Sequence, residues 1–205
     1  MEDHFARLTI PRRPWLDVEE LKHRFHELST EVHPDQSKND SEKSKAALEQ
    51  EFAEVNAAHQ CLSDTKSRVR HLIELELGQA PENVQSIPAA MTDWFMEIGA
   101  ICRKVDAFLT KKEQQDSPML QAALMGEGMA LNDEVAEMHQ KLQAELAKID
   151  DSLKALNPDW ERLDGVIDGR AGKLPLAKLD ALGQRLSFWG KWSAQLGERS
   201  IRLMF

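Results

Sequence analysis

The tripeptide His33-Pro34-Asp35 combines three residue types that suit a protein-docking loop. Proline fixes the backbone φ angle, so a turn built on Pro34 is rigid and loses little entropy when it binds. The carboxylate of Asp35 can accept two hydrogen bonds from one arginine, and the imidazole of His33 can hydrogen-bond with a partner's surface. The chemistry of these residues is therefore compatible with a rigid contact loop.

A catalytic role for the same residues is the weaker interpretation. His33 and Asp35 are two positions apart in a turn, which does not orient an acid–base pair, and no nucleophile motif accompanies them. A further alternative is that the tripeptide is only a turn that ends a helical hairpin. The residues themselves therefore give little support for catalysis.

The tripeptide follows a helix that the sequence predicts over residues 17–32. Asp17 and Glu20 have the capping-box spacing at its start. Pro34 cannot continue a helix and disfavours helical backbone at the residue before it, so this helix must end by Val32. The tripeptide therefore lies in a loop between two helices.

Apolar residues recur at three- and four-residue spacing through nearly the whole chain, which indicates an all-α fold. Further helices are predicted over 41–62, 66–77, 91–112, 118–156, 160–167 and from 175 onward. Two prolines and little periodicity place a linker at residues 79–90. The chain then divides into an N-terminal helical hairpin at 1–78 and a C-terminal antiparallel helical bundle at 91–205.

The helix after the tripeptide closes with a run that is typical of one family of domains. This run is Val55-Asn56-Ala57-Ala58-His59-Gln60-Cys61-Leu62-Ser63-Asp64, followed by Lys66 and Arg68. Together with His33-Pro34-Asp35, it resembles the J-domain of DnaJ-type co-chaperones over residues 1–78. The segments 5–17 and 70–78 are similar to those of the HscB family, the J-proteins of iron–sulfur cluster biogenesis, whose length and all-helical tail this chain shares.

The resemblance implies a co-chaperone with two parts, which is not an enzyme and for which we expect no cofactor. In the HscB family the His-Pro-Asp loop docks on a DnaK-type chaperone and triggers its ATP hydrolysis, while a three-helix bundle holds the scaffold protein on which clusters are built. We expect the same partners here: a DnaK-type chaperone, and an iron–sulfur scaffold as the client. A J-protein with another client, and a helical adaptor that has lost its coupling to the chaperone, remain alternatives.

The chaperone-binding face of J-domains is usually basic, yet residues 1–78 hold 16 acidic and 11 basic groups. Helical geometry partly resolves the conflict, because Lys22 and His26 fall on a stripe in line with His33. Three acids, Glu20, Glu27 and Glu31, point roughly the opposite way, with Arg24 among them. We expect Lys22 and His26 to contribute to docking; the alternative is that both are merely solvated.

A second candidate surface lies on the predicted helix at 91–112. Phe95 lies on the shoulder of its apolar stripe and Met96 points away from it, at places where the HscB family has an apolar pair that contacts the scaffold. Arg103 stands where that family has an acid. We expect Phe95, Met96 and Arg103 to face the client. An equally open alternative is that Phe95 and Met96 cover the interface with the J-domain.

Composition excludes several classes of function. The formal net charge of −9 argues against broad nucleic-acid binding. No window approaches the ~18 consecutive apolar residues of a membrane span, and the acidic Met1-Glu2-Asp3 start is unlike a secretory signal. We expect a cytoplasmic protein.

Cysteine and histidine patterns predict no metal. Cys61 and Cys102 are far apart without a CxxC motif, so each is interpreted as a small buried hydrophobe. His23 and His26 have a metal-compatible spacing but lack a third ligand. His59 stands where J-domains usually have tyrosine, and we expect it to face the core with a hydrogen-bond partner.

Overall fold

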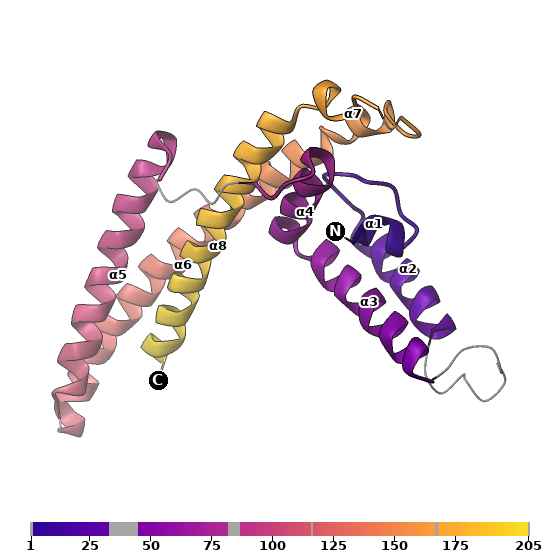
Figure 1. Cartoon of the computed structure of the whole chain (residues 1–205). Helices are drawn as coiled ribbons and strands as arrows, with labels where there is room; N and C mark the ends of the chain where they lie inside the picture. The colour runs from indigo at the N-terminus through magenta and orange to yellow at the C-terminus, as the bar shows by residue number, and fades with distance from the viewer. Residues whose placement is uncertain (1, 33–44, 82–86, 116, 167, 205) are drawn as a thin grey trace. The chain divides into compact units, whose positions relative to one another are not determined.

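The structure is a computed structural model, and it describes residues 2–32, 45–81, 87–115, 117–166 and 168–204. Its helices are α1 (His4–Arg7), α2 (Val18–Glu31), α3 (Lys45–Ser63), α4 (Thr65–Leu77), α5 (Thr92–Glu113), α6 (Pro118–Lys154), α7 (Asn157–Glu161) and α8 (Leu176–Met204) (Figure 1). Two 3-10 turns, at Ala89–Met91 and Ala171–Lys173, complete the elements. The described residues contain no strand, so the predicted all-α class is confirmed.

The chain forms two compact units that do not follow the predicted boundary. Unit 1 consists of Met1–Glu82 together with Asp150–Gly183, and unit 2 of Asn83–Ile149 together with Gln184–Phe205. The sequence assigned the segment 150–183 to the C-terminal bundle. Its membership in unit 1 depends on contacts between side chains far apart in sequence, which no local pattern reports.

Helix boundaries in unit 1 follow local capping chemistry. The side chain of Asp17 accepts hydrogen bonds from the backbone N–H groups of Glu19 and Glu20 and caps α2, as predicted. Asp64 caps α4 in the same way through Ser67, and Gly78 ends α4 with a φ of 72°, a conformation that glycine adopts without strain. α2 and α3 lie side by side as a hairpin (Figure 1).

A buried arginine holds the N-terminal segment of unit 1 to the turn between α3 and α4. Arg68 is 4% exposed. Its guanidinium donates to the carbonyls of Pro14 (3.1 Å) and Leu62 (2.7 Å) and to the hydroxyl of Thr65 (3.2 Å). These hydrogen bonds replace the water that the guanidinium loses on burial. Burial also lowers the pKa of Arg68. Arg68 therefore fixes how the chain enters α2.

Segment 150–183 attaches to the same N-terminal segment through polar contacts. The backbone N–H and C=O of Trp15 pair with the amide of Asn157, at 3.0 Å each. Arg13 donates two hydrogen bonds to the carboxylate of Asp164, at 2.9 and 2.5 Å. On α4, Glu76 accepts from Arg170 at 3.0 Å. These contacts explain why unit 1 includes residues that the sequence placed elsewhere.

Unit 2 is a bundle of α5 with parts of α6 and α8. Its buried core includes Ile98, Ile101, Cys102, Val105, Phe108 and Leu109 from α5, Leu131, Val135, Met138, Leu142 and Ile149 from α6, and Leu186, Trp189, Trp192 and Leu196 from α8. Ion pairs join the helices at the surface, Lys104 to Glu134 at 2.7 Å and Arg199 to Asp106 at 2.7 Å. The core stripe predicted on α5 is confirmed.

One expectation about the C-terminal region is wrong. The helix predicted at 160–167 is instead the short α7, which ends at Glu161, and turns follow it, with Gly165 in left-handed backbone at a φ of 75°. Ile201 near the end of α8 is 58% exposed.

Candidate functional sites

The His33-Pro34-Asp35 tripeptide lies outside the described residues. The structure does define both flanks, since α2 ends at Glu31 with Val32 as its C-cap and α3 begins at Lys45. The tripeptide thus belongs to the connection between two neighbouring antiparallel helices. The role of its three residues stays a prediction.

Lys22 and His26 are both exposed on α2. The ammonium of Lys22 lies 2.9 Å from the carboxylate of Glu19, one turn earlier on the same helix. His26 borders a shallow depression whose other lining residues are Arg24, Glu27, Thr30 and Glu31. Lys22 is therefore partly neutralised, and His26 has acidic neighbours at one edge.

His59 lies on α3 and packs against α2, the helix that carries Lys22 and His26. Its ring stacks on Phe25 of α2, with 4.1 Å between centroids, and its Nε2 lies 3.2 Å from the hydroxyl of Ser63. Burial lowers the pKa of His59, and the positive charges of His26 and Lys22 lower it further. The expected hydrogen-bond partner is confirmed, but His59 is only half-buried and does not lie fully inside the core.

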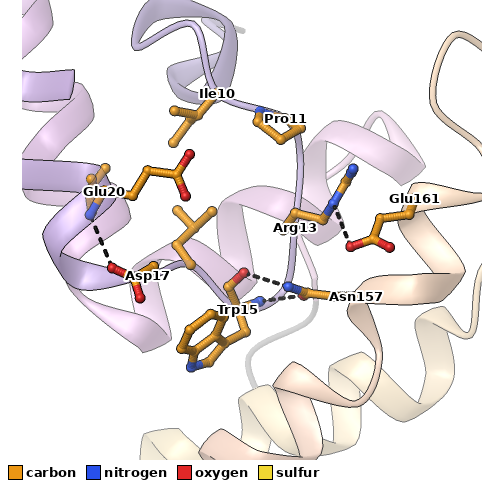
Figure 2. A pocket seen from close by; sticks show the side chains of 10 residues that line it. Ile10, Pro11, Arg13, Trp15, Asp17, Glu20, Asn157 and Glu161 are labelled. Atoms are coloured by element: carbon orange, nitrogen blue, oxygen red, sulfur yellow. Dashed lines mark hydrogen bonds and ion pairs between the residues drawn. The ribbon is translucent and has the colours of Figure 1, made fainter. Parts of the chain in front are cut away.

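A cavity of about 240 Å³ lies between the N-terminal segment and residues 157–161, all within unit 1 (Figure 2). Figure 2 shows the paired Trp15 and Asn157 on one side and Asp17 and Glu20 on another. Ile10, Pro11, Leu16 and Leu21 supply apolar wall. Sequence reasoning missed this cavity because its walls come from segments about 140 positions apart.

The predicted client surface on α5 is exposed. Phe95 and Met96 have 46% and 59% of their surface accessible, whereas their neighbour Trp94 turns inward and meets Trp189 edge-to-face at 4.8 Å. Arg103 is exposed too, and its guanidinium lies along the helix over Gly99, which has no side chain to obstruct it. The structure therefore brings Phe95 and Met96 together as an apolar pair on the outside of unit 2.

Three methionines of α6 form a further exposed apolar set that sequence reasoning did not single out. Met119, Met125 and Met129 are 84%, 65% and 65% exposed. They lie in the first part of α6, where Gly126 and Gly128 interrupt the heptad-like spacing. The concentration of methionines in this stretch is the sequence feature that could have indicated the exposed apolar set.

The structure also brings together His4, Cys61 and His71, from α1, α3 and α4. One possible ligand atom from each residue lies within 4.8 Å of the others. Cys102 is buried as expected, but Cys61 is only half-buried, so the interpretation of Cys61 as a buried hydrophobe is wrong. Sequence reasoning missed the cluster because its members have no motif spacing.

Comparison with known proteins agrees with this architecture. Residues 3–71 match the family model of the DnaJ domain. Among solved structures, human co-chaperone protein HscB is similar, with a TM-score of 0.62 and 18% identity over 98% of this chain and 83% of that chain. Chaperone HscB from Vibrio cholerae has a TM-score of 0.46 and 22% identity over 93% and 98% of the two chains. The N-terminal segment is thus a J-domain, and the human protein shares the fold.

No helix within the described ranges is both long enough and apolar enough to cross a lipid bilayer.

Proposed function

We propose that this J-domain protein stimulates the ATPase of a DnaK-type chaperone through His33-Pro34-Asp35, with Lys22 and His26 as supporting contacts. The observation that carries the proposal is the DnaJ-domain match over residues 3–71, which includes the tripeptide and both helices that flank it. The rigid proline turn and the carboxylate of Asp35 supply a low-entropy contact for an arginine. The protein performs no chemistry of its own in this role.

Steady-state ATP hydrolysis by a DnaK-type chaperone tests this proposal. Wild type should stimulate the rate severalfold, and His33→Gln should lose the stimulation. His23→Gln is a matched control, since His23 is an exposed histidine on α2 outside the stripe. Absence of stimulation by wild type would rule out the proposed coupling.

The client is proposed to be an iron–sulfur cluster assembly scaffold that binds at Phe95, Met96 and Arg103. Support comes from the exposure of the apolar pair and from the fold shared with human HscB. Exposed aromatic and methionine side chains are common anchors in protein interfaces. Arg103 replaces an expected acid, so the client should present an acidic or neutral group opposite it.

Titration against an iron–sulfur scaffold tests the client. Phe95→Ala and Met96→Ala should each weaken binding about tenfold, the usual effect of truncating an interface anchor. Ile201→Ala is the control, because Ile201 is equally exposed on another helix of unit 2. Unchanged affinity in both α5 variants, with wild type binding, would remove this pair from the client site.

The second candidate function is a helical adaptor without chaperone coupling. One observation favours it: Lys22 is engaged by Glu19 and His26 shares its depression with acids, which weakens the docking face. The ATPase measurement separates the two, because an adaptor binds its client without stimulating hydrolysis. The cytoplasmic location stays a prediction under either function.

A further inference from the structure

Three residues that share no sequence motif converge inside unit 1. His4 belongs to the single turn of α1, Cys61 to the last turns of α3, and His71 to the middle of α4. The rings of His4 and His71 are 4.4 Å apart between centroids. His71 is 7% exposed. The three side chains thus form a cluster of nitrogen and sulfur atoms at the junction of three helices.

The geometry points to a binding site for a zinc-class cation at His4, Cys61 and His71. Imidazole nitrogen and cysteine sulfur are the ligands that zinc prefers. Bonds of roughly 2.0 to 2.3 Å to a tetrahedral ion place ligand atoms about 3.4 to 3.6 Å apart. Because the ligand atoms here lie within 4.8 Å of one another, small side-chain rotations are enough to form the site.

The two histidines add a second, independent observation. Among the described residues, Nδ1 of His4 is buried and has no hydrogen-bond partner. A buried polar atom without a partner is unusual, and a cation would satisfy it. Nε2 of His71 accepts the backbone N–H of His4 at 3.1 Å. That nitrogen is therefore held unprotonated, as a metal ligand must be, and the cation would replace the N–H on its lone pair.

The neighbouring carboxylate does not complete the set. Asp3 accepts two hydrogen bonds from the guanidinium of Arg12, at 3.1 and 2.8 Å, and others from the N–H groups of Phe5 and Ala6. One oxygen is thus committed to capping α1 and the other to Arg12. The fourth position on the cation belongs to water, as in zinc sites with three protein ligands.

A cation at this site would fasten the one-turn α1 to α3 and α4. Such a short helix has little stability of its own, and its packing on α3 sets where the N-terminal segment begins. Binding to the folded state alone raises stability by mass action. The site shares no residue with the proposed chaperone and client surfaces, and it does not depend on the proposed function.

Cobalt substitution tests the site directly on the full-length protein. Co²⁺ bound to a thiolate gives a charge-transfer band in the near ultraviolet. Wild type and Cys102→Ser should bind one Co²⁺ per chain and show this band, and added Zn²⁺ should remove it. Cys61→Ser should lose the band, and His71→Phe, which keeps an aromatic ring but no ligand nitrogen, should bind at least tenfold more weakly. His139→Phe is the histidine control in unit 2.

A second measurement covers the case in which a variant fails to fold. In Cys102→Ser, Cys61 is the single remaining thiol of the chain. Zinc should slow its alkylation at least tenfold, and magnesium should not. Absence of a thiolate band in wild type, an equal band in Cys61→Ser, or alkylation that zinc leaves unchanged would each overturn the proposed site.

Discussion

Individual side chains far apart in sequence hold unit 1 together, and one of them is the buried Arg68. Its guanidinium spans two backbone carbonyls and one hydroxyl. Removal of the guanidinium leaves the carbonyls of Pro14 and Leu62 without their donor. Unpaired buried carbonyls each cost on the order of 1–3 kcal/mol.

We expect Arg68→Ala to lower the free energy of unfolding by about 3 kcal/mol or more. Arg68→Lys keeps the charge but not the forked donors, so it should recover only part of this loss. Urea denaturation followed by circular dichroism measures both. Arg70→Ala, at an exposed position on the same helix, is the control and should change stability little. Equal stabilities for Arg68→Ala and Arg70→Ala would contradict the assigned role.

The Arg13–Asp164 pair predicts a pH dependence. The hydrogen bond from Arg13 lowers the pKa of Asp164, with the charges of Arg13 and Arg170 acting in the same direction. Glu161, 3.8 Å from Arg13, is the other acid facing this guanidinium. A lowered pKa means that the carboxylate stabilises the fold at neutral pH, and that this stability disappears as the pH falls through the native pKa.

Asp164→Asn should therefore be about 1 kcal/mol less stable than wild type at pH ~7, a modest value because the Asp164 side chain is half exposed. The difference should vanish below the native pKa of the aspartate. Glu134→Gln, which removes a fully surface ion pair with Lys104, should show almost no difference at either pH. A constant difference between Asp164→Asn and wild type at all pH values would refute the assignment.

At the level of elements, local chemistry determines where helices begin and end. The caps at Asp17, Asp64 and Gly78 are readable in the sequence because each depends on residues within one turn. The end of α7 and the exposure of Ile201 are not readable in this way. Both depend on which neighbours happen to pack nearby, as does the membership of segment 150–183 in unit 1.

Two glycine-to-alanine changes test the assigned helices, because they should change the stability of the protein in opposite directions. Gly78 ends α4 with a positive φ, so Gly78→Ala should cost about 1 kcal/mol of stability. Gly126 lies inside α6 with open space where an added methyl group would lie, so Gly126→Ala should raise stability by about 0.5–1 kcal/mol. Thermal denaturation compares them. Stabilisation by both changes would show that α4 does not end at Gly78.

The candidate sites differ in how far the sequence could predict them. His33-Pro34-Asp35 and the exposed positions of Phe95 and Met96 could be proposed from motif, helical phase and family resemblance, since each signal is local. The cluster of His4, Cys61 and His71 joins three helices, and only the tertiary structure brings it together. Non-local sites of this kind leave no trace in residue spacing.

At the scale of the whole molecule, the proposed function is that one chain couples a client to a chaperone's ATPase. In this proposal the J-domain acts on the chaperone, and the α5 surface presents the client. Stimulation by chain and client together should therefore exceed the sum of their separate effects. The replacements Phe95→Ala and Met96→Ala should abolish this excess while preserving the stimulation by the chain alone.

The most direct test is the ATPase rate of a DnaK-type chaperone, measured with this protein, with an iron–sulfur scaffold, and with both. We predict more-than-additive stimulation by wild type, none above the scaffold alone by His33→Gln, and merely additive stimulation by the α5 double variant. A wild-type protein that leaves the ATPase rate unchanged in the presence and absence of scaffold would contradict the account.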